Sequence, residues 1–220
     1  GKKLDEAYTR EHLGLLEKGC ENLVAHLEIV RRSGIRPVVC LNGFHTDTPA
    51  EIALVRRVAE AHGALAAHSR HWLLGGEGAL ELAEAVEAAA AEPKQFQFLD
   101  RPDRPLRDRI DTIARVLYGA DGVAYTEAAE ARLRSLEADS RNAGLGVCMV
   151  KTHLSLSHDP ALKGRPRGWT LPIRDLLVYR GAGLVAPVAG EIKLMPGTAS
   201  DPAFRRIDVD PATGRVRGLA

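Results

Sequence analysis

The first part of the chain alternates between helical and extended patterns of apolar residues. From Arg10 to Arg32 the apolar positions recur three and four apart, which is the spacing of an amphipathic helix, and Ser33-Gly34 ends the pattern. The run Pro37-Val38-Val39-Cys40-Leu41 follows and is closed by Asn42-Gly43. Such a short run, rich in β-branched residues, predicts a buried strand that ends in a turn.

A second helix and a second strand complete this pattern. Thr48 stands at the position of an N-cap, Pro49 follows it, and helical spacing continues until Gly63. The run 64–67 predicts another strand, which leads through Trp72 into the glycine-rich turn 75–78. A strand, a crossover helix and a parallel strand form a βαβ unit, so both strands should end at the same edge of a sheet.

The remaining chain continues in shorter pieces, which set the expected fold. Helical spacing covers 79–91, 105–118 and 126–142, and extended patterns cover 96–99, 123–125, 146–151, 171–179 and 184–188, with a terminal hairpin over 208–216. We predict an α/β fold with a partly parallel sheet and flanking helices around the βαβ core, plus a mixed, loop-rich carboxyl-terminal region. The expected division is an α/β region over 1–104 and a second α/β region over 105–220 packed against it.

Two aromatic residues follow the two strands of the βαβ unit. Phe44 comes directly after the first strand and Trp72 shortly after the second, although aromatic residues make up only 5% of the chain. Open α/β sheets bind ligands at the carboxyl ends of their strands, so the two rings could hold a flat heteroaromatic ligand between them. The alternative is that both rings close the rim of the core.

Other side chains near these loops have two possible roles each. Asp47 either stabilises the start of the following helix or accepts hydrogen bonds from a bound ligand. Three histidines near the loops are candidate metal ligands: His45, His68 and His71. Their spacing favours solvated histidines instead. The turn Gly75-Gly76-Glu77-Gly78 lacks the Gly-Lys-Ser/Thr ending of a phosphate-binding loop, and Glu77 would repel phosphate.

Composition and charge exclude several classes of partner. The chain has 30 Lys and Arg residues against 29 Asp and Glu, so its balance argues for neither nucleic acid nor an anionic membrane. No apolar run approaches the roughly 18 residues of a spanning helix, and no segment resembles a signal peptide, so we expect a soluble cytoplasmic protein. Cys20, Cys40 and Cys148 are scattered within apolar patterns, which predicts buried, reduced thiols.

Several motifs together resemble those of one enzyme family. The segments 42–48 and 69–78 are similar to the N-x-F-P-T-D-T and S-x-x-W-x-K-G-G-x-G motifs of formate–tetrahydrofolate ligase. Further matches follow in the family's order along the whole chain: Tyr118-Gly119-Ala120-Asp121-Gly122-Val123, Lys151-Thr152, Ser155-Leu156-Ser157, Gly164-Arg165-Pro166-Arg167-Gly168, Arg174-Asp175 and Met195-Pro196-Gly197.

The resemblance implies a reaction and a role for this part of the enzyme. In that family ATP phosphorylates formate, and N10 of tetrahydrofolate then attacks formyl phosphate to give 10-formyltetrahydrofolate. The residues that match Phe44 and Trp72 stack on the pterin ring, so the resemblance implies that the region 1–104 carries the pterin-binding loops. It also implies that ATP with Mg²⁺ binds mainly to a larger amino-terminal part and that the enzyme is a homo-oligomer, a tetramer in the family. We assign no catalytic residue and no metal ligand to this chain.

Two departures from the family motifs leave alternatives open. His45 replaces a proline and Leu74 replaces a lysine, which loosens one loop and removes a positive charge from the other. The alternatives are a non-catalytic folate-binding or assembly module of the same family and a metal-dependent hydrolase that uses the three histidines. The cluster Lys163, Arg165 and Arg167 either is solvated or contacts a ligand carboxylate or a neighbouring subunit.

Overall fold

The chain forms two units. The computed structural model describes residues 6–190 and 200–218. The first unit is Gly1–Gly190 and the second is Glu191–Ala220. The division expected between residues 104 and 105 lies inside the first unit and stays a prediction, and the motif Met195-Pro196-Gly197 falls outside the described residues.

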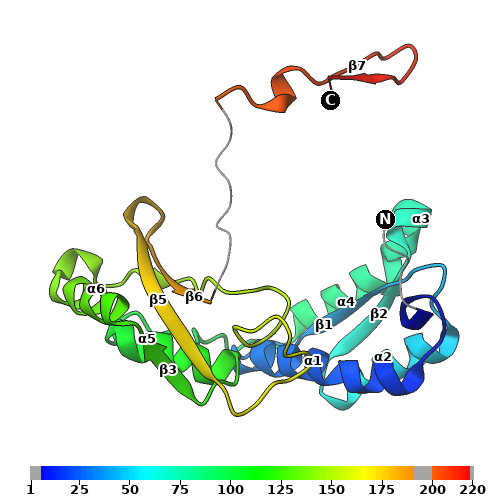
Figure 1. Cartoon of the computed structure of the whole chain (residues 1–220). Coiled ribbons are helices and arrows are strands. Elements are labelled where there is room, and N and C mark those ends of the chain that lie inside the picture. The colour runs from blue at the N-terminus through cyan, green and yellow to red at the C-terminus, as the bar shows by residue number, and fades with distance from the viewer. Residues whose placement is uncertain (1–5, 191–199, 219–220) are drawn as a thin grey trace. The chain divides into compact units, whose positions relative to one another are not determined.

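The predicted βαβ unit is present near the start of the first unit (Figure 1). Helix α1 (Leu13–Arg32) precedes strand β1 (Val38–Asn42), helix α2 (Pro49–Ala61) and strand β2 (Leu65–Ser69). A short 3₁₀ turn, Glu6–Tyr8, stands before α1. The two strands pair in parallel, from Val38 opposite Leu65 to Asn42 opposite Ser69, so both end at the same edge. The α/β fold expected from the apolar pattern is confirmed.

The two faces of this small sheet are covered unequally. Val39, Leu41 and Ala66 point to one face and pack with Leu27 of α1 and Ala59 of α2. Successive strand residues alternate between faces, so the residue between Val39 and Leu41 points the other way. That face is covered mainly over β2, which α4 contacts more extensively than β1.

This inequality corrects the expectation for β1 and Cys40. No side chain of β1 is buried, and Cys40 is exposed on the face opposite α1 and α2. Cys148 is also exposed, because its neighbours Val147 and Met149 pack against the core and leave it on the other side. Of the three cysteines only Cys20 is buried, and burial raises the pKa of its thiol.

A helical segment follows β2 and leads into irregular chain. It consists of α3 (His71–Leu74), a 3₁₀ turn over Gly75–Ala79, and α4 (Leu80–Ala91). The strand predicted over 96–99 does not form. Gln97 N–H instead donates to Ser33 O at 2.9 Å, so this segment follows the turn after α1 rather than a neighbouring strand. Phe96 and Phe98 are exposed and meet edge to face, with ring centroids 5.0 Å apart.

The second half of the first unit contains a mixed sheet with the strand order β3-β5-β6-β4. Figure 1 labels β3, β5 and β6 of this sheet. Its strands are β3 (Gly122–Tyr125), β4 (Gly146–Val147), β5 (Thr170–Tyr179) and β6 (Leu184–Ala189). β3 is parallel to β5 and β4 is parallel to β6, whereas β5 and β6 are antiparallel and are joined through a 3₁₀ turn over Arg180–Ala182. The expected mixed sheet is therefore present.

Helices pack against this sheet, and their ends differ from the sequence prediction. α5 (Leu106–Thr112) continues as a π-turn over Ile113–Leu117, and Thr126 is the N-cap of α6 (Glu127–Ala138). α6 ends earlier than expected because a separate 3₁₀ turn, Ser140–Asn142, follows Asp139. The strand predicted over 146–151 is reduced to β4 and one isolated bridge between Val150 and Val188.

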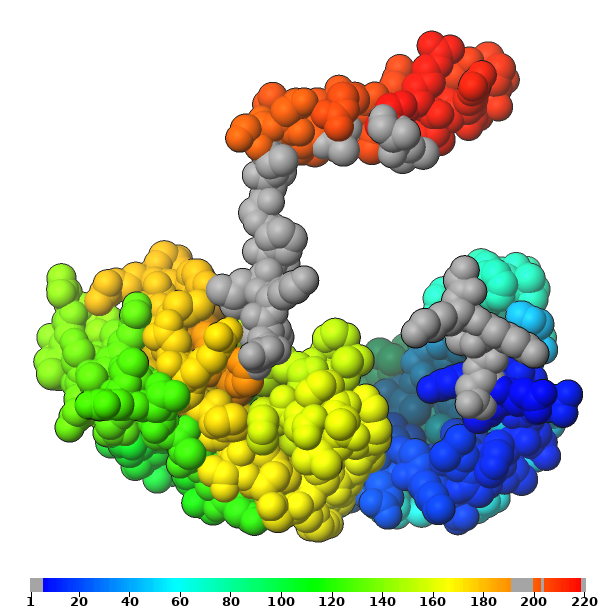
Figure 2. Space-filling view, in the orientation of Figure 1, coloured from blue at the N-terminus to red at the C-terminus, as the bar shows by residue number. Residues whose placement is uncertain are grey.

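The segment between β4 and β5 is a long loop that reaches α1. Figure 2 shows this yellow segment against the blue surface of α1. Asn22 Nδ2 donates to Gly164 O at 3.0 Å, and Arg165 forms a two-bonded ion pair with Glu28. Loop contacts therefore connect the mixed sheet to the βαβ region within the first unit.

The described part of the second unit contains the predicted terminal hairpin. A 3₁₀ turn over Ala203–Arg205 precedes β7 (Asp208–Val209) and β8 (Val216–Arg217), which are antiparallel. Asp210 N–H donates to Arg215 O at 3.0 Å across the turn. Across all described residues, no helix combines the length and apolar character needed to cross a bilayer.

Candidate functional site

The loops after β1 and β2 lie side by side, as the βαβ topology requires. Gly43 N–H donates to Ser69 O at 2.9 Å, and Trp72 Nε1–H donates to Gly43 O at 3.3 Å. The indole of Trp72 is therefore fixed against the loop that carries Phe44. This part of the prediction, two neighbouring loops each with an aromatic residue, agrees with the observed contacts.

The two rings themselves remain open to solvent. Phe44 and Trp72 are each 62% exposed, so neither closes the rim of the core. Among the described residues they do not form a ring–ring pair with each other. Large aromatic side chains gain most when their faces are covered, and most of the surface of these two side chains is accessible to a ligand.

Two glycines pack closely in these loops, and Gly78 leaves no room for a side chain because it faces backbone atoms. A Cβ at Gly43 would lie 2.1 Å from Nε2 of His68, and a Cβ at Gly78 would lie 2.6 Å from the backbone of Arg70. Arg70 N–H donates to Gly78 O at 2.9 Å, which closes the glycine-rich turn onto the residue two positions before Trp72. The turn thus closes next to Trp72, and a role in shaping a pocket beside Trp72 stays a prediction.

Asp47 organises the first loop through its own backbone. Its Oδ2 accepts from Phe44 N–H at 2.8 Å, and its N–H donates to Phe44 O at 3.1 Å. Asp47 is exposed, and its other carboxylate oxygen has no hydrogen bond in the described part of the chain. One oxygen therefore fixes the loop while the other is available to a donor.

A capping box that sequence reasoning missed anchors the same loop. Thr48 Oγ1 accepts from Glu51 N–H at 3.3 Å, and Glu51 Oε2 accepts from Thr48 N–H at 3.0 Å. The Thr48 N–H bond lowers the pKa of the Glu51 carboxyl. The signal was present in the sequence, because Thr or Ser followed three residues later by Glu is the capping-box pattern.

A cavity of about 250 Å³ lies beside this loop. It is lined by Leu16 of α1, by the end of β1 and by α2, and its residues are Leu16, Leu41, Asn42, Gly43, Asp47, Glu51, Ile52 and Val55. Phe44 and Trp72 are not among them. Small-molecule pockets usually have about 300–1,000 Å³, so this cavity suits one ring system rather than a whole cofactor.

The histidines near the loops have other contacts. Oγ of Ser69 lies 2.9 Å from Nδ1 of His71, the ring of His68 lies against Gly43, and His45 is exposed. Within the described ranges no three His, Cys, Asp or Glu side chains are placed to hold a metal ion.

The basic cluster in the loop before β5 is not simply solvated. Arg165 pairs with Glu28 of α1, Lys163 Nζ donates to Leu154 O at 3.3 Å, and Arg167 has no partner among the described residues. The alternative of a solvated cluster is therefore wrong for Arg165, because its guanidinium group is bonded to Glu28 of α1.

Comparison with known proteins identifies the family. The family model for formate–tetrahydrofolate ligase matches residues 1–220. The chain belongs to the formate–tetrahydrofolate ligase family. It is 61% identical over 219 residues to the formate–tetrahydrofolate ligase of Dehalococcoides mccartyi (strain ATCC BAA-2266 / KCTC 15142 / 195), covering all of this chain and 37% of that protein.

Further formate–tetrahydrofolate ligases give the same result. The chain is 58% identical to the ligase of Desulfotalea psychrophila and 58% identical to that of Syntrophobacter fumaroxidans, each over 219 residues. These matches again cover the whole chain but only 39% and 37% of the relatives. The chain thus spans well under half the length of the formate–tetrahydrofolate ligases it matches.

Proposed function

We propose that this chain is the folate-binding part of a formate–tetrahydrofolate ligase, with the pterin held between the loops after β1 and β2. The observation that carries the proposal is the bond from Trp72 Nε1–H to Gly43 O, which brings the indole onto the loop with Phe44 and Asp47. That bond uses the N–H of the indole, and Trp72 is still 62% exposed. Phe44 would cover the other face of the ligand.

Asp47 would accept hydrogen bonds from the amino-pyrimidine edge of the pterin. The amino-pyrimidine edge of a pterin presents N–H donors, and a carboxylate oxygen is a strong acceptor for such donors. Asp47 can accept with one oxygen while the other holds the Phe44 N–H at 2.8 Å. Ligand binding would then need no rebuilding of the loop, which lowers its entropic cost.

The reaction assigned to the complete ligase follows from the family. Formate takes a phosphoryl group from ATP, and N10 of tetrahydrofolate attacks the carbonyl carbon of formyl phosphate. The new C–N bond replaces the C–O bond to phosphate, and N10 loses its proton. In this scheme residues 1–104 position the pterin so that N10 faces the part of the enzyme that forms formyl phosphate.

The glycine-rich turn of this chain does not fit the phosphates of ATP with Mg²⁺. The turn Gly75–Ala79 is short, its Gly78 carbonyl already accepts from Arg70 N–H, and Glu77 adds a negative charge. We therefore assign no step on the phosphates to these residues. A tetrameric assembly and a cytoplasmic location belong to the same proposal.

The direct test is kinetic and uses a complete ligase that carries these residues. Trp72→Ala and Phe44→Ala should each weaken tetrahydrofolate binding by about 1–3 kcal/mol, the cost of losing a stacking aromatic side chain. KM for tetrahydrofolate should rise and KM for ATP should not. Phe98→Ala, which removes an exposed phenyl ring outside the two loops, is the matched control. Unchanged KM values in both loop variants would leave the non-catalytic module as the better hypothesis.

A further inference from the structure

The two edges of the β1–β2 sheet differ. Among the described residues this sheet has two strands, which pair in parallel. Every strand edge presents a row of backbone N–H and C=O groups, which native proteins pair, cover or protect with charged side chains. A sheet of two strands is marginally stable by itself, and parallel pairing is the less stable kind. The way in which each edge is protected therefore indicates where the sheet ends.

The outer edge of β2 is closed by an ion pair. Residues of a parallel strand bond alternately to its two sides, and Leu65 N–H donates to the carbonyl that precedes β1 at 3.0 Å, so Ala66 and His68 face outward. Arg56 Nη1 donates to Ala66 O at 3.0 Å, and Glu81 Oε2 accepts from His68 N–H at 3.3 Å. Arg56 and Glu81 also pair with each other at 2.7 Å. These side chains occupy the positions that a further strand would need.

The outer edge of β1 has no such protection. By the same alternation, the backbone groups of Val38, Cys40 and Asn42 point away from β2, and no strand in the described part of the chain pairs with them. The strand contains no charged side chain. Cys40 and Asn42 are exposed, and Val38 is only partly buried. This edge is therefore a template on which a further strand can pair.

The position of α1 indicates which strand this would be. Leu27 of α1 and Ala59 of α2 pack on the same face of the sheet, together with Val39 and Leu41 of β1. Connections that run from a strand through a helix to a parallel strand are right-handed in nearly all cases. The connection through α2 leads from β1 to β2. A parallel strand connected through α1 to β1 would therefore lie on the side of β1 away from β2.

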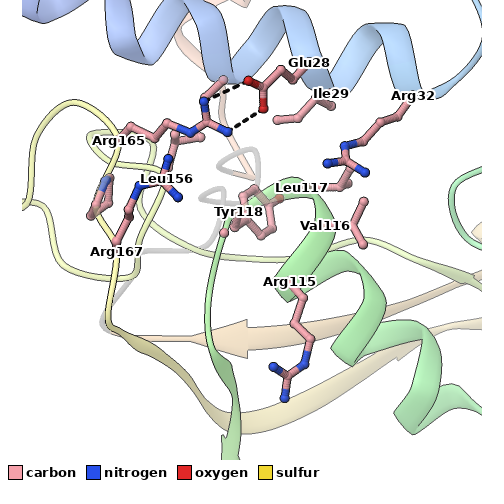
Figure 3. A pocket seen from close by; sticks show the side chains of 13 residues that line it. Glu28, Ile29, Arg32, Arg115, Val116, Leu117, Tyr118, Leu156, Arg165 and Arg167 are labelled. Carbon is pink, nitrogen blue, oxygen red and sulfur yellow. Dashed lines mark hydrogen bonds and ion pairs between the residues drawn. The ribbon is translucent and has the colours of Figure 1, made fainter.

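Contacts with the rest of the first unit hold α1 in this position. The carboxylate of Glu28 forms a two-bonded ion pair with Arg165 of the loop before β5 (Figure 3). Asn22 Nδ2 donates to Gly164 O of the same loop at 3.0 Å. The helix is thus bonded to this loop as well as packed on β1, so its placement does not depend on a single contact.

We propose that β1 is an interior strand in the complete ligase and that its open edge pairs in parallel with a strand that precedes α1 and lies outside these 220 residues. The relatives have the length of chain that this requires, since the matches cover only 37% and 39% of them. Each outward residue of β1 offers one N–H donor and one C=O acceptor. Because parallel strands end at the same edge, the added strand would end beside the loop that carries Phe44. The inference does not depend on the proposed pterin site.

The test is backbone amide hydrogen exchange, resolved by residue, in the 220-residue chain and in a complete ligase that carries these residues. The amides of Val38, Cys40 and Asn42 should exchange at least about tenfold more slowly in the complete ligase, because each gains a hydrogen bond within a sheet. The amides of Val39 and Leu41 face β2 and report folding, so they should be protected in both proteins.

Two controls separate strand pairing from other causes of protection. The amide of Ala66 lies on the closed edge of β2 and should exchange equally in both proteins. Exchange in the 220-residue chain should not depend on its concentration, and protection that grows with concentration would overturn the proposal, because a second copy would then occupy the edge.

The complete ligase alone decides the point if fast exchange at Val39 and Leu41 shows that the isolated chain is unfolded. There, the amides of Val38, Cys40 and Asn42 should be as well protected as those of Val39 and Leu41. Exchange of the three outward amides at the rate of an unprotected chain, with Val39 and Leu41 protected, would overturn the proposal.

Discussion

At the scale of single residues, an ion pair with a buried arginine joins an irregular segment to α5. Nε and Nη2 of Arg109 bond to the two carboxylate oxygens of Asp100 at 2.5 and 2.6 Å, and the side chains are only 4% and 20% exposed. Asp100→Ala would leave the guanidinium buried without a partner, so we expect unfolding to become easier by about 3–5 kcal/mol. Urea denaturation measures this change.

A neighbouring ion pair supplies the control for that prediction. Arg101 and Asp103 pair at 2.8 Å, but both side chains are largely exposed, and exposed pairs contribute little. Asp103→Ala should therefore leave the urea midpoint close to that of the unmodified protein. Equal effects of the Asp100 and Asp103 substitutions would contradict the assignment of the first pair to the core.

Lys151 is a second residue whose role is structural. Its ammonium group donates to the carbonyls of Thr152 and Ser157 at 3.0 and 3.1 Å and also to Ser155 O, and it lies 4.8 Å from the centroid of the Tyr118 ring. Burial lowers the pKa of this lysine. Lys151→Met leaves three carbonyls without their donor.

We expect Lys151→Met to destabilise the fold by about 1–3 kcal/mol, the usual cost of unsatisfied buried polar groups. Lys163→Met is the matched control, since exposed Lys163 makes a single 3.3 Å bond. Thermal denaturation of both variants decides the point. A lower melting temperature only in the control would contradict this role for Lys151.

At the scale of elements, α2 begins with a capping box that links stability to pH. Thr48→Ala removes the acceptor for Glu51 N–H and should cost about 1 kcal/mol. The pKa of Glu51 is lowered in the folded state, so its contribution is complete above the unfolded value of about 4.3 and is lost as the pH falls through the folded value.

Urea unfolding between about pH 7 and about pH 3 tests this linkage. The unmodified protein should lose stability toward the acid end, and Glu51→Gln should lose less, because it has no carboxylate to protonate at the cap. Glu87→Gln on the exposed face of α4 should keep the unmodified slope. The same slope in Glu51→Gln as in Glu87→Gln would show that the cap carries no such linkage.

The elements also show what the sequence could predict. The helices with a clear 3.6-residue period and a capping residue, such as α1, α2 and α6, were predicted within a few residues of their observed ends. The β1–β2 pairing followed from the short crossover between them. The segment 96–99 was predicted as a strand because alternation alone does not reveal whether a partner strand is within reach.

Burial was harder to predict than secondary structure. Cys40 lies in an apolar strand, yet the face it points to is covered mainly over β2. The candidate site shows the same limit. Sequence order predicted that the loops with Phe44 and Trp72 would be neighbours, but not the cavity beside Asp47, because that cavity needs Leu16 of α1, which lies far from the loop in the sequence.

At the scale of the whole molecule, the chain spans 37–39% of the formate–tetrahydrofolate ligases it matches. We expect the 220 residues alone neither to bind ATP tightly nor to form formyl phosphate, since they contain no phosphate-binding loop of the Gly-Lys-Ser/Thr type. Equilibrium dialysis with ATP and an assay for 10-formyltetrahydrofolate test this. Efficient ATP-dependent formylation by the purified chain would contradict the proposal that this chain binds the pterin and another part of the ligase binds ATP.

The central claim, that a pterin stacks on the indole of Trp72, can be tested by fluorescence. The chain has two tryptophans, and Trp169 is buried with its Nε1–H bonded to Pro166 O, so it supplies a constant background. Titration with tetrahydrofolate, corrected for absorption and ligand emission, should change the emission of the unmodified chain saturably, and Trp72→Phe should abolish that change. A saturable change of equal size in Trp72→Phe would contradict the account.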